Sequence, residues 1–278
     1  MNSSFKILLK SFKFMAGSVL LISIISVALI YPVINPADPF DMVAMAFQPP
    51  GEGLILGTDN FGRDAFLELT HGTKTSLFVG IVSGAIATIF GLAVGLFSGY
   101  KGGLLDDILT SVTNIFIVIP SFIILILVSV SIDSRSTWIT AAIIGLTSWP
   151  WTARSVRAQT SSLRNRDHVN IARISGYGTG KIIVFEILPY IASYVVMAFI
   201  IQLASGILSE ASVSMLGLGP LNTVSLGIML NWALMFEAPM AGAWWAFIPP
   251  AIAIAFITFS LYLMNLGMDE IFNPKIRS

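Results

Sequence analysis

The segment NIARISGYGTGKIIVFEILP, residues 170–189, interrupts a chain whose other long segments are mostly apolar. It contains three glycines and two basic residues, Arg173 and Lys181. Glycines in such a context are also typical of loops that bind phosphate. Its location and the spacing of its glycines therefore decide both the fold and the function of the chain.

The composition of the 278-residue chain indicates a membrane protein. The chain is 55% hydrophobic and 11% charged, with a mean hydropathy of +0.85, whereas soluble domains carry roughly 25% charged residues. A formal net charge of zero indicates no nucleic-acid partner. The chain has no cysteine, which excludes thiolate metal sites and a cysteine nucleophile, and two histidines are too few for a histidine-built metal centre. We expect no metal site and no catalytic residue.

Six apolar segments reach or approach the roughly 20 residues that a membrane-spanning helix needs. The first follows a basic N-terminus, but it is longer than the apolar core of a signal peptide and no clear cleavage site follows it. No internal repeat or linker is evident. We therefore predict an all-α, polytopic membrane protein with one domain over residues 14–266, an N-terminal segment 1–13 and a tail 267–278. The predicted spans are residues 14–34, 77–98, 108–130, 138–151, 187–208 and 243–266.

The distribution of lysine and arginine predicts the orientation of these spans. With the N-terminus in the cytoplasm, twelve of the 15 basic residues fall in inside segments. The other three, Arg63, Lys74 and Arg135, fall outside, which is a strong positive-inside bias. We therefore expect both termini and the 170–189 segment to be cytoplasmic, and an acidic loop at about 35–76 to be outside.

The spacing of the glycines excludes a phosphate loop. The pattern G-x-x-x-x-G-K-[ST], aligned on Gly180–Lys181, places Ser175 at the first glycine and Ile182 at the final hydroxyl position. No predicted strand precedes the segment. We therefore expect no ATP site in this chain.

The segment instead predicts a short amphipathic helix near residues 166–176. Val169 and Ala172 share one face of this helix, and Gly176 is a suitable helix stop because glycine accepts a left-handed conformation. The chain then re-enters the membrane with Pro189 in the first turn of a span. Two interpretations remain open: a basic loop on anionic lipid, or a rigid handle for a partner protein.

Several motifs resemble one family. Gly176, followed by Ile187-Leu188-Pro189 in the spacing G-x10-I-L-P, resembles the EAA motif of ABC importer permeases. Other segments, in the order of the family and over most of the chain, resemble the C-type permease of dipeptide, oligopeptide and nickel importers. They are LGTDNFGRD (56–64), GLFSGYKGGLLDDIL (95–109), IPSF (119–122), WPWTARSVR (149–157) and SMLGLG (214–219).

The resemblance implies a type I ABC importer permease fold in which the short helix is a coupling helix that docks on an ATPase subunit. Where the family usually has Glu-Ala-Ala, this chain has Asn170, Ile171 and Ala172. Asn170 can therefore replace the glutamate only as an uncharged hydrogen-bonding group. The residues implied in coupling are Asn170, Ala172, Arg173, Gly176, Ile187, Leu188 and Pro189.

The resemblance also implies the partners. A second homologous permease, two ABC ATPase subunits that bind ATP and Mg, and an extracytoplasmic solute-binding protein would complete the importer in the cell membrane. The chain itself would be no enzyme and would hold no cofactor.

Polar residues in predicted spans are candidates for the translocation path, since such groups avoid lipid. Gln202, Ser205 and Ser209 share one helical face, and Pro120 is expected to kink the third span. Hydrogen bonding between helices, without contact to cargo, is the alternative for each residue. The path candidates are Asn114, Gln202, Ser205, Ser209 and Glu210.

The outside-loop motif GTDNFGRD lacks the spacing of a calcium loop. We expect a turn cross-linked by local Asp–Arg contacts, in a position suited to receive the binding protein. Its residues are Gly57, Asp59, Gly62, Arg63 and Asp64.

Two other classes of protein fit the sequence less well. An ion-coupled secondary transporter favours carboxylates deep in spans and inverted repeats, whereas Glu210 and Glu237 are predicted near the outer boundary. For a membrane enzyme, the sequence lacks a plausible set of catalytic His, Cys or paired carboxylate residues on one face. For cargo, the resemblance favours short peptides and leaves short oligosaccharides, such as a disaccharide, and nickel complexes open.

Overall fold

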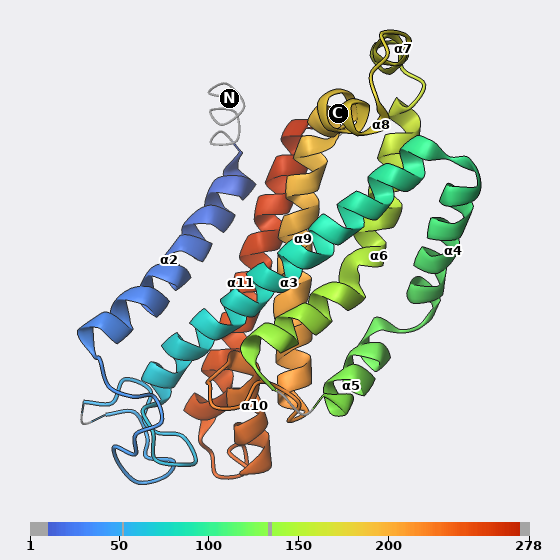
Figure 1. Ribbon diagram of the computed structural model, residues 1–278. Coiled ribbons are helices and arrows are strands. Elements are labelled where there is room, and N and C mark those ends of the chain that lie inside the picture. Colours follow the sequence, from blue (N-terminus) through green and yellow to red (C-terminus); the bar gives the residue numbers. More distant parts are fainter. Residues whose placement is uncertain (1–10, 52, 133–134, 273–278) are drawn as a thin grey trace.

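The computed structural model describes residues 11–51, 53–132 and 135–272. Most of the predicted segment 1–13 and half of the predicted tail 267–278 lie outside these residues. The described part of the chain is built from helices (Figure 1). The elements are α2 (Phe12–Ile34), α3 (Ala65–Lys101), α4 (Gly103–Val118), α5 (Ser121–Ser131), α6 (Thr137–Leu163), α7 (Asp167–Ile174), α8 (Thr179–Ile182), the π-helix η1 (Ile183–Ile187), α9 (Leu188–Met215), α10 (Leu226–Met235) and α11 (Trp244–Phe272).

The long apolar helices agree with an all-α membrane protein. Among the described residues, α2, α3, the continuous stretch Thr179–Met215 and α11 are long and apolar enough to cross a bilayer. The bent pair α4–α5 makes a fifth candidate if it counts as one span. All six predicted segments thus fall on helices, and the fourth, residues 138–151, lies on the more polar α6. Helix α11 continues past residue 266 to Phe272.

The third predicted span is broken rather than kinked. Helices α4 and α5 meet at an angle of 84° around Ile119–Pro120. Proline has no N–H to donate, and it disfavours the helical conformation of the residue before it. Ile119 accordingly adopts an extended conformation with ψ 124°. The sequence predicted the place of this bend and underestimated its size.

Helices α3 and α6 extend beyond the predicted spans. The first turns of α3 carry polar residues that are nonetheless buried, such as Thr70 and Thr73. The hydroxyl of Thr73 donates to the carbonyl oxygen of Leu69 at 2.8 Å, which satisfies it within the helix. Hydropathy therefore places the start of α3 too late, at residue 77 instead of Ala65.

Small residues let α3 cross the bundle in close contact with α6 (Figure 1). A Cβ atom added at Gly95 would lie 2.6 Å from the carbonyl oxygen of Ala153, and one at Gly91 would lie 2.7 Å from Cβ of Thr152. Close approach of backbones through small residues is how helices associate where lipid provides no hydrophobic driving force.

The two ends of the bundle differ. Helices α7 and α8 lie at one end, which we call the α7 end, together with the turn between α3 and α4 (Figure 1). The segment 35–64 and α10 lie at the opposite end, which we call the loop end. Helix α2 stands at one flank of the bundle, and the α4–α5 pair stands at the other.

Candidate functional site

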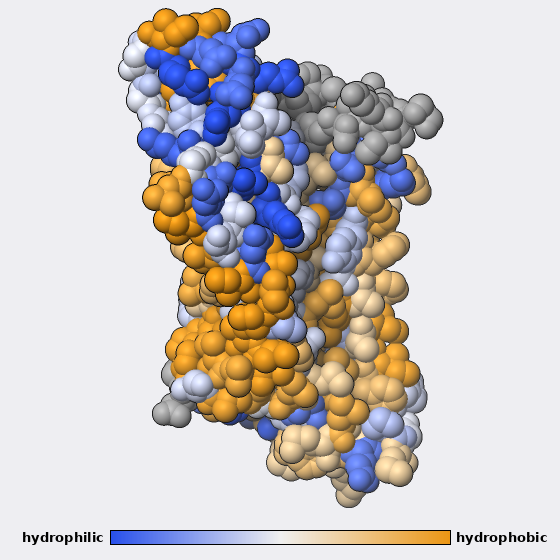
Figure 2. Space-filling view, turned by 90° about the vertical axis from the view of Figure 1, so that its right-hand side faces the viewer, coloured by the Kyte–Doolittle hydropathy of each residue, from blue (hydrophilic) through white to orange (hydrophobic). Residues whose placement is uncertain are grey.

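Helix α7 is anchored on one face and exposed on the other. Val169 and Ala172 are buried in an apolar cluster with residues of α3, α6 and η1, including Val156 of α6. On the opposite face Ile171 and Ile174 are 64% and 87% exposed. Figure 2 shows apolar atoms at the extremity of the molecule, beyond a polar zone at the α7 end. Helix α7 therefore exposes apolar side chains on one face while its other face is buried in the protein.

The predicted helix stop at Gly176 is confirmed. Gly176 has φ 82°, and its N–H donates to the carbonyl oxygen of Arg173 at 3.1 Å. The N–H of Tyr177 reaches back to the carbonyl oxygen of Ala172, also at 3.1 Å. This pair of bonds is the Schellman motif, which favours glycine at the left-handed position.

Asn170 makes its hydrogen bonds within this chain. Its Nδ2 donates to the carbonyl oxygen of Asn165 at 3.1 Å, and its Oδ1 accepts from Nη1 of Arg173 at 3.2 Å. Nη2 of Arg173 also donates to the carbonyl oxygen of Arg164 at 3.3 Å. Asn170 and Arg173 thus brace α7 against the loop that follows α6. Whether Asn170 also contacts a partner stays a prediction.

The chain returns from α7 to α9 through the π-helix η1. Ile187 is buried, Leu188 is half-buried, and Pro189 lies in the first turn of α9, as predicted. Nε2 of His168 in α7 lies 3.2 Å from the carbonyl oxygen of Glu186, and its ring stacks on Tyr190 with centroids 4.5 Å apart. His168 therefore joins α7 to the start of α9, a contact that the sequence analysis missed because its partners follow 18 and 22 positions later.

A cavity of about 370 Å³ lies beside the break between α4 and α5. Helices α4, α5, α6, α9 and α11 contribute to its wall, and the wall mixes hydroxyl and amide groups with aromatic rings. It carries no acidic or basic side chain. The lining residues are Phe116, Ile117, Ile119, Ser121, Thr147, Ser148, Pro150, Trp151, Ile201, Gln202, Ser205 and Tyr262.

The structure separates the residues predicted to line the path. Gln202 and Ser205 border the cavity, and Asn114 borders a second cavity of about 120 Å³. Gln202 donates to the carbonyl oxygen of Ser148 at 3.0 Å and to Oγ1 of Thr152 at 2.8 Å. Its amide group therefore joins α9 to α6, as in the hydrogen-bonding alternative. Ser209 is half-buried and borders neither cavity.

Glu210 lies five residues before the end of α9 and is 0% exposed. Its carboxylate accepts from the hydroxyl of Ser76 on α3 at 2.8 Å and from that of Ser214 at 2.6 Å. The hydroxyl of Ser76 also accepts from the N–H of Leu226, at the start of α10, at 3.2 Å. In this conformation Glu210 joins α3, α9 and α10 and faces neither cavity. The sequence suggested its position near an end but not its burial.

The motif at residues 56–64 forms a compact turn at the loop end. Oδ1 of Asp59 accepts from the N–H groups of Phe61 and Arg63, each at 2.8 Å. Asp64 caps α3, with its Oδ1 accepting from the N–H of Phe66 at 2.9 Å. Burial raises the pKa of the Asp59 carboxyl, against the opposing effect of the N–H groups of Arg63 and Phe61.

The local Asp–Arg contact that we expected forms through the backbone of Arg63 and not through its guanidinium. The guanidinium of Arg63 lies 3.5 Å from the carboxylate of Glu68, and Asp59 bonds to the backbone of Arg63 instead. Aromatic rings surround the same guanidinium, with Phe61 at 4.3 Å and Trp232 at 5.0 Å. Because Trp232 belongs to α10, Arg63 fixes the loop to that helix through cation–π contacts.

The fold and these sites define a polytopic helical permease: apolar helices surround a cavity whose wall mixes polar and apolar groups, and an anchored short helix projects at one end. Comparison with known proteins agrees. Residues 91–278 match the family described as the binding-protein-dependent transport system inner membrane component.

The chain is also similar to proteins of known name over nearly its whole length. It is 30% identical to the dipeptide transport system permease protein DppC of Haemophilus influenzae, over 94% of this chain and 90% of that protein. It is 29% identical to DppC of Bacillus subtilis, over 95% of this chain and 82% of that protein. The chain therefore belongs to the family of binding-protein-dependent inner membrane components, as an ABC importer permease of the peptide group, and the resemblance seen in its motifs is confirmed.

Proposed function

We propose that this chain forms half of the translocation pathway of an ATP-driven, solute-binding-protein-dependent importer of short peptides. In this proposal α7 is the coupling helix, and it docks on an ABC ATPase subunit that binds ATP and Mg. A second homologous permease provides the other half of the pathway, and this chain hydrolyses no ATP.

The observation that carries the proposal is the two-sided character of α7. Its buried face, with Val169 and Ala172, lies in one apolar cluster with residues of α3, α6 and η1, so a displacement of α7 disturbs the packing of these helices. Its outer face exposes Ile171 and Ile174, which would be unfavourable in water without a partner. A basic loop resting on lipid needs no such rigid anchoring. We therefore favour the interpretation in which α7 is the rigid element that a partner protein binds.

The orientation follows from the distribution of basic residues. We place the α7 end in the cytoplasm, where the ATPases are, with both termini, and the loop end outside, where the binding protein docks. The compact turn at residues 56–64 then belongs to the receiving surface. Gly57, Gly62 and Asp64 serve there as shape-determining residues rather than as direct contacts.

Short peptides are the proposed cargo because the relatives over nearly the whole chain are named as dipeptide permeases. The wall of the 370 Å³ cavity carries no charged side chain, which suits cargo whose side chains vary. Binding measurements on the cognate solute-binding protein with dipeptides, a disaccharide and a nickel complex test this point. Binding of the disaccharide alone would contradict it.

The substitution Gly176→Trp tests the coupling role in a reconstituted complex. A tryptophan finds open space there, but φ 82° is unfavourable for any residue with a Cβ, so the turn that holds α7 must change. We expect the complex to assemble and hydrolyse ATP while uptake falls at least tenfold. Gly178→Trp is the matched control, because Gly178 is equally open and has φ −69°. Normal uptake by Gly176→Trp would contradict the proposal.

A further inference from the structure

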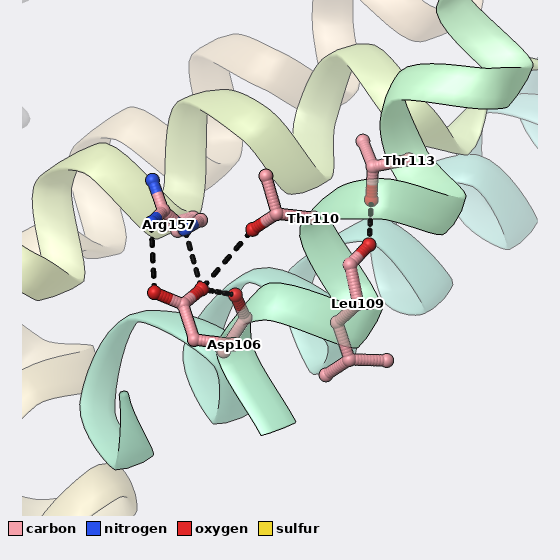
Figure 3. A network of polar contacts seen from close by, with 6 residues as sticks. Asp106, Leu109, Thr110, Thr113 and Arg157 are labelled. Carbon is pink, nitrogen blue, oxygen red and sulfur yellow. Dashed lines mark hydrogen bonds and ion pairs between the residues drawn. The ribbon is translucent and has the colours of Figure 1, made fainter. Parts of the chain in front are cut away.

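A two-pronged ion pair joins α4 to α6 near the α7 end (Figure 3). Nε of Arg157 donates to Oδ1 of Asp106 at 2.6 Å, and Nη2 donates to Oδ2 at 2.7 Å. The hydroxyl of Thr110 donates to the same Oδ1 at 3.1 Å, and the hydroxyl of Ser98, on α3, donates to it as well. A bidentate arginine–carboxylate pair fixes geometry as well as distance.

Among the described helices, α4 has its main contacts with α3 and α6. It starts at Gly103, directly after Gly102, these two glycines having φ 60° and 66°, and it ends at the Pro120 break. Thr113 is its one buried residue. A helix with a glycine turn at one end, a break at the other and a mostly exposed surface can pivot, so the bonds of Asp106 to α3 and α6 decide what it moves with.

The contact between α4 and α6 is interrupted along its length. The cavity of about 120 Å³ separates the two helices next to the ion pair, and Thr110, Asn114 and Arg154 line it. Beyond the cavity the rings of Phe116 and Trp149 meet with centroids 5.6 Å apart. Close packing therefore does not extend from the ion pair to the aromatic contact.

The arginine of the pair is next to residues that hold α7. Val156, adjacent to Arg157 in the chain, lies in the same apolar cluster as Val169 and Ala172. Helix α6 also ends at Leu163, shortly before α7 begins at Asp167. A displacement of α7 thus reaches the part of α6 that carries Arg157.

We propose that the Asp106–Arg157 pair makes α4 follow α6 and α7, and so carries the displacement of α7 to the broken span beside the 370 Å³ cavity. The inference rests on the proposed function, since it needs α7 to move with the ATP cycle. Asp106 and Arg157 are positioning residues, and neither borders that cavity.

Pulsed electron paramagnetic resonance on the reconstituted complex tests the inference. The chain has no cysteine of its own, so introduced cysteines place spin labels without background from this subunit. One label at Ile22 on α2 serves as reference. The second sits at Ile174 on α7 or at Val118 on α4, which are 87% and 80% exposed. In the otherwise unchanged chain we expect trapping with ATP and vanadate to shift both distances.

In Asp106→Asn we expect the Ile174 distance to shift as before, the Val118 shift to fall by at least half, and cargo moved per ATP to fall about fivefold. Asp107→Asn removes the same charge from an exposed neighbour and should change neither quantity. If Asp106→Asn does not assemble, Arg157→Lys replaces it, because lysine keeps the charge and loses the two-pronged geometry.

Three outcomes separate the inference from the proposed function. An unchanged Val118 shift in Asp106→Asn, or in Arg157→Lys, would overturn the inference and leave coupling through α7 intact. An equal loss of the shift in Asp107→Asn would also overturn it. No shift at Ile174 in the unchanged chain would contradict the proposed function itself.

Discussion

Glycine turns and hydrogen bonds occur at both ends of the bundle, but they are buried at the loop end and exposed at the α7 end. At the loop end Thr58 is completely buried, its hydroxyl bonds to two backbone groups of the segment 45–48, and Gly57 and Gly62 have backbone of other residues packed against them. At the α7 end Gly176 lies in open space, and the outer face of α7 is exposed. The loop end therefore holds one shape, whereas the α7 end offers a surface that is complete only with a partner.

The largest expected difference is between two glycines that share a positive φ. Gly57→Ala places a Cβ against the backbone of Gln48 and Pro49 at φ 65°, and we expect it to lower the free energy of unfolding by roughly 3 kcal/mol. Gly176→Ala meets no neighbour and should cost only about 1 kcal/mol. Thermal unfolding followed by tryptophan fluorescence measures both. Equal costs would show that the loop end is no more rigid than the α7 end.

A second comparison concerns hydroxyl groups. The hydroxyl of Thr58 donates to the carbonyl oxygen of Met45 at 2.6 Å and accepts from the N–H of Gln48 at 2.8 Å. Thr58→Val leaves both groups buried and unpaired, so we expect a loss of about 2 kcal/mol. Ser175→Ala, at the α7 end, removes one exposed bond to the carbonyl oxygen of Ile171 and should change stability by less than about 0.5 kcal/mol. A larger loss from Ser175→Ala would contradict the comparison.

The smallest effect concerns the first residues of the helices at each end. Asp64 caps α3, whereas Arg166, at the same position of α7, offers no side-chain cap. Arg166→Ser should stabilise α7 by about 0.5 kcal/mol, which slows hydrogen exchange of its amides about twofold. Asp64→Ala is the opposite change and should weaken the start of α3 by about 1 kcal/mol. Unchanged exchange in Arg166→Ser would mean that α7 is held by its neighbours alone.

Local chemistry made part of the structure predictable. The apolar segments, the stop at Gly176, the entry at Pro189 and the position of the bend at Pro120 all depend on a residue and its near neighbours. The early start of α3 escaped detection because its threonines satisfy their hydroxyls inside the helix and are buried by other helices. Hydropathy counts such residues as polar wherever they lie.

Pairings between distant residues were not predictable in this way. Asp106 and Arg157 are 51 positions apart, and Ser76 and Glu210 are 134 apart. A single sequence contains no signal that joins such residues. The contact of the Arg63 guanidinium with Glu68 was missed for a related reason, since only the fold of the loop brings the two together. The break at Pro120 exceeded a kink because the extended conformation of Ile119 ends α4 before the proline.

Cysteine cross-linking at Ile174 tests the central claim most directly. A single cysteine there, in the otherwise cysteine-free chain, is expected to cross-link to an ATPase subunit in the assembled complex, with a yield that changes when ATP is added. A single cysteine at Met45, which is similarly exposed at the loop end, should cross-link to no ATPase subunit. Absence of any ATPase cross-link from position 174, or the same cross-link from position 45, would contradict the assignment of α7 as the coupling helix.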